Sequence, residues 1–260
     1  MLTLKNKIAY LFDMDGTINI GNKAFPAAIE LFKKLHKMGK KVIVLTNNSS
    51  RTSKEHMAKL IDMGFQENTF SVYSSVDVTI EYLKEEHPKS RIYLLGTNSV
   101  KREFERNGIQ ISEESPDIAV LSFDTELTYE KLKRFCRFVR EGAFYVATNP
   151  DINCPSEEGP IPDAGSLIAA VERSTGRVPD LVVGKPNPTM LHTLLEKLDL
   201  KPEDAVMIGD RLYTDIEMAK RAGIDAILVL SGETRKEDLK MPVQENPLVF
   251  ESVESILKLL

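Results

Sequence analysis

The sequence has few residues of the kinds that build disulfide frameworks and zinc sites. It contains two cysteines and four histidines among 260 residues, and neither type recurs at the short spacings of metal ligands. Cys136 and Cys154 are therefore interpreted as reduced side chains with no ligand role. A reducing cytoplasm is the expected location.

The sequence also lacks a long hydrophobic run and an excess of positive charge. Its first apolar run, Ile8 to Phe12, ends at Asp13, so it predicts neither a signal peptide nor a membrane span of about 20 residues. The formal net charge is -5 at pH 7, and the basic residues occur in short, scattered runs. We therefore expect no membrane partner and no nucleic-acid partner.

What the sequence does contain is an alternation of short apolar runs with amphipathic stretches. Continuous apolar runs of this kind are typical of strands buried on both faces of a parallel sheet, and the alternation predicts an α/β fold. Strands are expected at 8–12, 42–45, 91–95, 118–123, 144–147, 181–183, 205–208 and 226–230. Helices are expected at 27–38, 53–63, 76–86, 98–107, 128–140, 164–174, 188–198, 213–222 and 252–259.

The strongest chemical signal is a pair of carboxylates directly after the first apolar run. Asp13 and Asp15 flank Met14 and are followed by Gly16, which allows a sharp turn. An ionised carboxylate at the end of a buried strand is costly unless a cation or hydrogen-bond donors compensate for it, and a second carboxylate adds repulsion. An acidic turn that merely ends the strand is the structural alternative.

Three further polar signals follow predicted strands. The segment Thr46 to Ser50 offers a hydroxyl and backbone N–H groups that suit a phosphate, although it also reads as an ordinary helix cap. Lys185 follows the run 181–183, where it could balance clustered negative charge. Asp210 and Asp215 follow the run 205–208, and carboxylates of this kind suit Mg²⁺. In doubly wound sheets, ligands bind at this edge.

Together, in this order, the four signals resemble the motifs of the haloacid dehalogenase superfamily. The pattern Asp13-x-Asp15-Gly16-Thr17 is similar to its first motif, and Thr46, Lys185 and Gly209-Asp210-x4-Asp215 are similar to the other three. The segments 45–49 and 147–151 resemble the nitrophenylphosphatase or NagD-like branch. So does the last motif in its form Gly209-Asp210-Arg211-x2-Thr214-Asp215. The resemblance covers the whole chain and implies a doubly wound, Rossmann-like core with an inserted α/β cap domain.

The resemblance implies a Mg²⁺-dependent phosphatase that forms an aspartyl-phosphate intermediate. Asp13 would be the nucleophile, and the Asp15 side chain would be the general acid and base. Asp15 fits phosphatases and phosphomutases, because dehalogenases lack an acid at this position. Mg²⁺ would be held by the Asp13 side chain, the Asp15 backbone carbonyl and the Asp210 side chain.

The resemblance also implies binding and supporting roles for the remaining motif residues. Thr46, Asn47 and Lys185 would hold the phosphoryl oxygens, and Lys185 would also offset repulsion among the carboxylates. Asp215 would orient Lys185 or a metal-bound water rather than bind the metal directly. Gly16 and Thr17 would support the first motif.

More than a hundred residues separate Thr46 from Lys185, far more than a single crossover of about 30 residues requires. We expect a catalytic core formed by 1–75 and 181–260 and an inserted α/β cap at 76–180. The resemblance implies that the cap sets substrate preference, favours small phosphorylated metabolites and is compatible with a homodimer formed through the cap. Asn149 and Asp151, in the long loop 149–163, are candidates for substrate contact, although a simple polar loop is an equal alternative.

Three other functions stay open at this point. A phosphomutase would use the same two aspartates but return the phosphoryl group to its substrate. A phospho-acceptor signalling module would combine similar residues, but in about half this length and without an insert. A binding protein with a vestigial site is disfavoured because every catalytic position is filled. The sequence does not identify the natural substrate, and nucleotide, sugar, glycerol and pyridoxal phosphates all fit.

Overall fold

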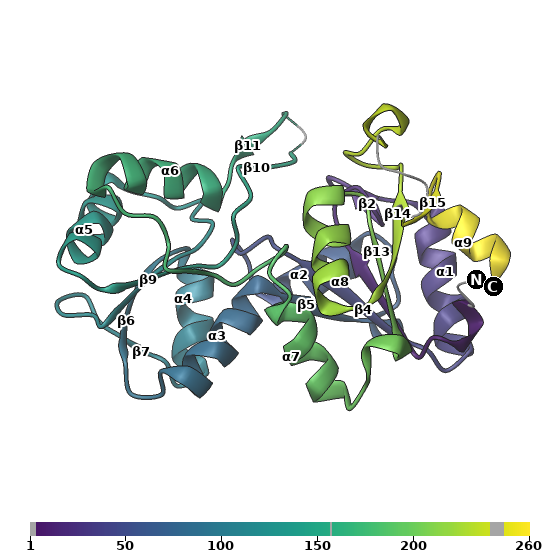
Figure 1. The fold of residues 1–260 in the computed structure, drawn as a ribbon, viewed down its shortest axis with the longest axis horizontal. Coiled ribbons are helices and arrows are strands. Elements are labelled where there is room, and N and C mark those ends of the chain that lie inside the picture. Colours follow the sequence, from purple (N-terminus) through teal and green to yellow (C-terminus); the bar gives the residue numbers. More distant parts are fainter. Residues whose placement is uncertain (1–3, 157, 240–246) are drawn as a thin grey trace. The chain divides into compact units, whose positions relative to one another are not determined.

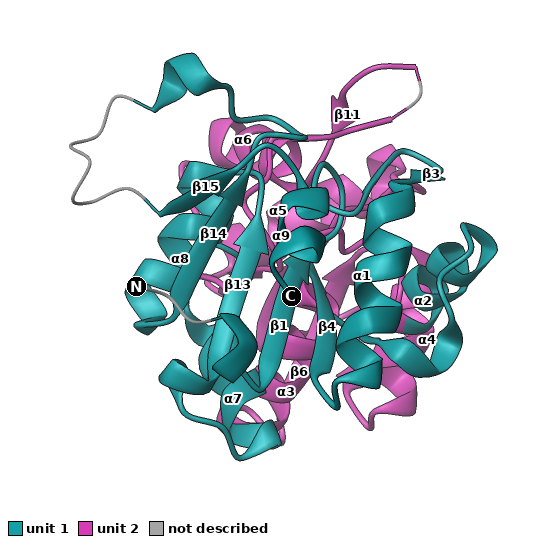
Figure 2. Ribbon diagram, turned by 90° about the vertical axis from the view of Figure 1, so that its right-hand side faces the viewer, with its two compact units in different colours: residues 1–46, 54–73, 185–260 teal, residues 47–53, 74–184 magenta. Residues whose placement is uncertain are grey.

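The apolar runs of the sequence form two separate sheets, one in each of two units of the chain (Figures 1 and 2). In the computed structural model, residues 4–156, 158–239 and 247–260 are described. Unit 1 comprises residues 1–46, 54–73 and 185–260, and unit 2 comprises 47–53 and 74–184. The expected insert, 76–180, lies within unit 2, which additionally takes in residues 47–53, 74–75 and 181–184 of the expected core.

Unit 1 contains a six-stranded sheet in the order β15-β14-β13-β1-β4-β5 (Figure 2). Neighbouring strands from β15 to β4 all pair in parallel. The strands are β1 (Ala9–Asp13), β4 (Lys41–Thr46), β5 (Ser71–Ser74), β13 (Ala205–Gly209), β14 (Asp225–Val229) and β15 (Leu248–Phe250). The helices are α1 (Pro26–Lys37), α2 (Ser53–Asp62), α7 (Thr189–Leu198), α8 (Glu217–Ala222) and α9 (Val253–Leu259).

The sequence of unit 1 explains why these elements pack as they do. The strands β1 and β13 are buried along almost their whole length, as their continuous apolar runs predict. Pro26 occupies the first turn of α1, where its missing N–H costs no hydrogen bond. The apolar face of α1 carries Phe32, whose ring lies 4.9 Å from that of Phe12 and 5.0 Å from that of Phe65. These rings fix α1 against the sheet.

Unit 2 contains a five-stranded parallel sheet in the order β12-β9-β8-β6-β7. Its strands are β6 (Arg91–Leu95), β7 (Gln110–Ile111), β8 (Ile118–Leu121), β9 (Phe144–Ala147) and β12 (Leu181–Val182), with a separate hairpin of β10 (Asn153–Cys154) and β11 (Ile161–Pro162). Its helices are α3 (Ser75–Glu86), α4 (Asn98–Arg106), α5 (Tyr129–Arg140) and α6 (Ala164–Thr175). Each begins at a polar side chain that caps it: Ser74, Thr97, Thr128 and Asp163.

The α/β fold class predicted from the alternation is confirmed, because both sheets are parallel and flanked by helices. The sequence analysis missed several short strands, none of which contains an apolar run of four residues: β5, β7, β10, β11, β15 and the hairpin of β2 (Asn19–Ile20) and β3 (Lys23–Ala24). The helix expected at 213–222 is divided into a π-helical turn, Leu212–Ile216, and α8. Short 3-10 turns cover 4–6, 67–69, 202–204 and 236–238.

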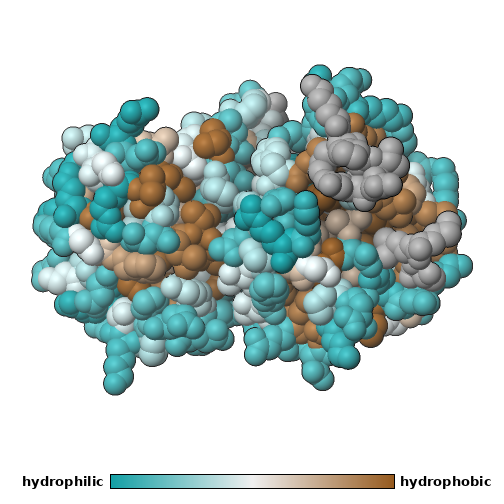
Figure 3. Space-filling model, in the orientation of Figure 1, coloured by the Kyte–Doolittle hydropathy of each residue, from teal (hydrophilic) through white to brown (hydrophobic). Residues whose placement is uncertain are grey.

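On the face shown in Figure 3, hydrophilic residues predominate, and hydrophobic residues gather in places on both units. Among the described residues, Tyr129 is the most exposed large hydrophobic residue, at 83%. Across the described ranges, none of the helices has the length and apolar character that a membrane crossing requires.

Candidate active site

Four segments bring polar side chains to the carboxyl edge of the unit 1 sheet. Asp13 ends β1, Thr46 ends β4, and Asp210 directly follows β13. Lys185 reaches the same edge, where its ammonium lies 3.4 Å from the carbonyl of Leu45. The parallel register places the ends of β1, β4 and β13 side by side, which brings these residues together.

Lys185 forms the centre of the ionic contacts in the site. Its buried ammonium hydrogen-bonds to the Asp13 carboxylate and donates to Asp215 Oδ1 at 2.7 Å. Burial alone would lower the pKa of Lys185, but the negative charges of Asp13 and Asp215 raise it above its ordinary value. The lysine therefore stays charged, and Asp215 orients it.

The carboxylates of Asp13, Asp210 and Asp215 form a buried cluster in which one oxygen from each residue lies within 4.8 Å of the other two. Burial, followed by the charges of Asp13 and Asp215, raises the pKa of Asp210 to about 8. Burial raises the pKa of Asp215 to about 6, and the nearby charge of Lys185 limits the rise. When all three carboxylates are ionised, one lysine does not neutralise them, so the ionised cluster has capacity for a further cation.

The donor set of this cluster fits Mg²⁺, which prefers hard oxygen ligands. The packing behind Asp210 also holds its carboxylate in place. A Cβ added to Gly16 would lie 2.5 Å from Asp210 Oδ2, and one added to Gly232 would lie 2.0 Å from the same atom. Gly16 also has a φ of +95°, a backbone conformation that favours glycine. Thr17 is fully buried, and its hydroxyl lies 3.4 Å from Asp210 Oδ1.

The segment after β14 contributes residues that the sequence analysis missed. The backbone N–H of Glu233 donates to Asp210 Oδ2 at 2.7 Å, and the Ser231 hydroxyl donates to the carbonyl of Gly16 at 2.7 Å. The Glu233 carboxylate pairs with Arg211 at 2.9 Å. This segment follows a predicted strand at the same sheet edge, so the reasoning applied to the other strand ends could have found it.

Asp15 lies beside the carboxylate cluster but has contacts of its own. Its Oδ1 accepts a hydrogen bond from Asn19 Nδ2 at 2.9 Å and lies 4.0 Å from Lys59 Nζ. Burial raises the pKa of Asp15 above its ordinary value, and the charge of Lys59 opposes that rise. A raised pKa suits a carboxyl group that has to donate a proton.

The predicted phosphate-binding residues fall in both units. Thr46 and Lys185 belong to unit 1 and are buried. Asn47 belongs to unit 2, where its carbonyl accepts a hydrogen bond from the Ser75 hydroxyl at 3.0 Å. A Cβ on Gly184 would lie 2.6 Å from Asn47 Oδ1, so glycine at 184 permits this close approach.

The two candidate substrate residues of the loop 149–163 differ in their surroundings within unit 2. Asn149 is completely buried, accepts hydrogen bonds from the hydroxyls of Ser49 and Thr148 at 2.9 Å each, and donates to Asp163 Oδ1 at 3.1 Å. Asp151 is half-buried. The geometry thus gives Asn149 a role in holding the loop together.

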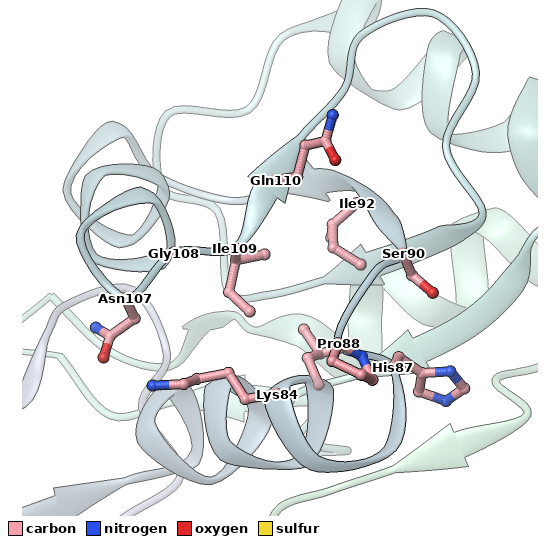
Figure 4. A pocket seen from close by; sticks show the side chains of 10 residues that line it. Lys84, His87, Pro88, Ser90, Ile92, Asn107, Gly108, Ile109 and Gln110 are labelled. Atoms are coloured by element: carbon pink, nitrogen blue, oxygen red, sulfur yellow. The ribbon is translucent and has the colours of Figure 1, made fainter.

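A separate cavity of about 280 Å³ lies in unit 2, between the end of α3 and the strands β6 and β7 (Figure 4). Its lining combines Ile92, Ile109 and Pro88 with the side chains of Lys84 and His87. None of the residues that line it is a predicted site residue. The predicted catalytic residues therefore lie outside this cavity.

Comparison with protein families gives two matches. A family described as haloacid dehalogenase-like hydrolase matches residues 10–110, and a second HAD hydrolase-like family matches residues 182–256. The first match includes Asp13, Asp15 and Thr46, and the second includes Lys185 and Asp210.

Relatives of similar length match nearly the entire chain. An acid sugar phosphatase of Staphylococcus saprophyticus is 33% identical over 98% of both chains, and the 5'-nucleotidase YutF of Bacillus subtilis is 31% identical over 91% of this chain and 92% of its own. Among solved structures, a 4-nitrophenylphosphatase of Thermotoga maritima is 44% identical, with a TM-score of 0.91 and 98% coverage of both chains.

Proposed function

Since this chain belongs to the haloacid dehalogenase superfamily, in its nitrophenylphosphatase and NagD-like branch, we propose that it is a Mg²⁺-dependent phosphatase of small phosphorylated metabolites. The phosphatase class follows from the activities in its relatives' names, all of which are phosphoric monoester hydrolases. The single observation that carries the mechanism is the contact of Lys185 with Asp13, beside the buried carboxylate cluster.

In the proposed first step, an Asp13 oxygen attacks phosphorus and forms an aspartyl phosphate. The bond from phosphorus to the leaving oxygen breaks, and its electron pair moves to that oxygen. A carboxylate is a weak nucleophile, so positioning and charge neutralisation must provide most of the rate. The Lys185 ammonium holds Asp13 in place, and Thr46, Asn47 and Lys185 are proposed to bind the phosphoryl oxygens.

Asp15 completes the proposed cycle as general acid and then general base. Its carboxyl group donates a proton to the leaving oxygen, and the resulting carboxylate takes a proton from the water that hydrolyses the aspartyl phosphate. Such proton transfer contributes about 10²–10⁴-fold in rate. We expect Asp15→Asn to slow both half-reactions.

Mg²⁺ would be held by the side chains of Asp13 and Asp210 and by the backbone carbonyl of Asp15. When bound, it would supply positive charge that offsets the negative charge of the phosphoryl group. Asp215 keeps its contact with Lys185 and stays outside this ligand set in the proposal. The buried position of Asp210 and the glycines packed on it support this assignment.

The experiment is turnover of p-nitrophenyl phosphate with Mg²⁺ by the wild type and Asp13→Asn. We expect the variant to lose all measurable turnover and to keep its circular dichroism spectrum and unfolding midpoint. Near-normal rates in the variant would refute the mechanism. Release of inorganic phosphate over many turnovers separates the phosphatase from a phosphomutase and from a phospho-acceptor module.

The insert 76–180 is proposed to act as a cap that sets substrate preference, with Asp151 as a candidate for substrate contact and Asn149 as the residue that holds its loop. The names of the relatives mention sugar phosphates and nucleotides, which supports small phosphorylated metabolites as substrates. Turnover rates against a panel of such metabolites would identify the preferred one. A cap-mediated homodimer and a cytoplasmic location stay predictions of the sequence.

A further inference from the structure

The Asn19 side chain connects the first catalytic motif to the β2–β3 hairpin. Its Nδ2 donates to Asp15 Oδ1 at 2.9 Å and to the carbonyl of Gly21 at 3.1 Å. Both partners accept hydrogen bonds, so the amide must turn its NH₂ group toward them. Among residues 4–156, 158–239 and 247–260, Asn19 Oδ1 has no hydrogen-bond partner although it is buried. An unpaired buried acceptor is costly, so this orientation is maintained against a penalty.

Lys59 approaches the same carboxylate oxygen from a different element. It lies in the last turn of α2, and its Nζ is 4.0 Å from Asp15 Oδ1. Both side chains are partly shielded, with 21% of the Lys59 side chain and 17% of the Asp15 side chain exposed. An amide donor and an ammonium therefore converge on Oδ1, while neither of these two contacts involves Oδ2.

We infer that Asn19 and Lys59 are positioning residues, which hold Oδ1 of Asp15 so that Oδ2 carries the catalytic proton to the leaving oxygen. The inference rests on the proposed role of Asp15 and adds the residues that orient it. Because Oδ1 already faces donors, the proton of the neutral carboxyl group belongs on Oδ2. As the bond from phosphorus to oxygen breaks, that proton moves to the departing oxygen.

The sensitivity of the reaction to its leaving group tests this inference. Nitrophenolate departs with little protonation, whereas the more basic phenolate of phenyl phosphate needs the proton more. The two esters differ only in the nitro group, and kcat/KM for each reports the step in which the leaving group departs. Loss of proton donation therefore lowers kcat/KM for phenyl phosphate more than for p-nitrophenyl phosphate.

The variants are Asn19→Leu, which keeps the side-chain volume, and Lys59→Met, which keeps the aliphatic chain. The control is Lys54→Met, because Lys54 is exposed on the same helix. We expect Asn19→Leu and Lys59→Met to lower kcat/KM for phenyl phosphate roughly tenfold more than for p-nitrophenyl phosphate. Lys54→Met should behave as wild type, and Lys59→Arg should restore most of the selective loss.

Equal losses on the two esters would overturn the inference, because they would indicate a general structural effect or a contact with the phosphoryl group. Lys59→Met is expected to fold even if Asn19→Leu does not, since Lys59 is partly exposed. Asp15→Asn, measured with the same two esters, tests the role of Asp15 separately from the positioning roles of Asn19 and Lys59. If Asp15→Asn shows no selective loss, the proposed role of Asp15 is wrong; if it alone shows one, only the positioning role is wrong.

Discussion

At the scale of single residues, the site depends on close contacts that leave no room for a side chain. Gly16 and Gly232 come from distant parts of the sequence and pack against the same carboxylate, that of Asp210. Gly209 is constrained in the same way, because its Cβ would lie 2.3 Å from the Cβ of Asp215. The positions of the acids are therefore fixed by neighbours as well as by the strands that carry them.

We predict that Gly232→Ala weakens Mg²⁺ binding, because the new methyl group would displace the Asp210 carboxylate. Changes to groups that orient metal ligands typically cost about 10–100-fold in affinity. The Mg²⁺ concentration for half-maximal turnover should rise by about that factor. Gly96→Ala is the control, since the nearest side-chain atoms there lie at 3.3 Å and can adjust. An unchanged Mg²⁺ requirement in Gly232→Ala would contradict the assignment.

Asn149 gives a second prediction at this scale. Removal of its amide in Asn149→Ala leaves Ser49, Thr148 and Asp163 without a shared partner, and should lower the free energy of unfolding by about 1–3 kcal/mol. Urea denaturation measures this change, with Asp151→Ala as the comparison. Full stability combined with a raised KM in Asn149→Ala would instead indicate direct substrate contact.

At the scale of elements, α1 and the π-helical turn show how packing positions the catalytic edge. The turn at Leu212–Ile216 positions the Asp215 carboxylate. Its Oδ2 accepts a hydrogen bond from the Arg211 backbone N–H at 3.2 Å, and its Oδ1 contacts Lys185. A π-helical turn of this kind often marks a functional site. On α1, Phe32 lies against Phe12, which directly precedes Asp13.

We predict that Phe32→Ala destabilises unit 1 through the cavity it leaves among Phe12, Phe65 and Phe70. The loss of a buried phenyl ring typically costs about 3–5 kcal/mol. Chemical denaturation should show this shift, whereas Tyr129→Ala, at an exposed position, should change stability by less than about 0.5 kcal/mol. A loss below about 1 kcal/mol for Phe32→Ala would mean that the aromatic cluster contributes little.

At the scale of the whole molecule, the raised pKa values of Asp210 and Asp215 link stability to pH and to Mg²⁺. Between the ordinary carboxyl pKa and about 8, folded Asp210 keeps a proton that the unfolded chain has released. The folded state then binds more protons, so its stability falls as pH rises through this window. In the proposed site, Mg²⁺ would bind the ionised carboxylates and would therefore reverse the trend.

We therefore predict that metal-free protein has a lower Tm at about pH 8 than at about pH 6, and that Mg²⁺ raises Tm more at the higher pH. Asp210→Asn should abolish the Mg²⁺ effect and flatten the pH dependence of the metal-free protein. Thermal unfolding with and without Mg²⁺ at both pH values provides the measurement. A Mg²⁺-induced rise in Tm that persists in Asp210→Asn would place the metal elsewhere.

The sequence alone predicts the fold class and the order of the candidate catalytic motifs. Buried parallel strands require continuous apolar runs, and polar residues at or just beyond the ends of those runs interrupt that pattern. Asp13, Thr46, Lys185 and Asp210 stand at such positions, so they are recognised from the sequence. Strands such as β5, β7 and the β2–β3 hairpin were missed because they lack an apolar run of three residues, whereas β12, with only two residues, lies in such a run and was predicted.

The neighbours of the predicted residues become visible only in the folded structure. Asn19 and Lys59 carry no sequence signal, yet they meet at one oxygen of Asp15 because the β2–β3 hairpin and α2 approach it from different directions. Gly232 contacts Asp210 for the same reason, from the turn that follows β14. Contacts between segments distant in sequence depend on how elements pack, and a local pattern of residues does not encode that packing.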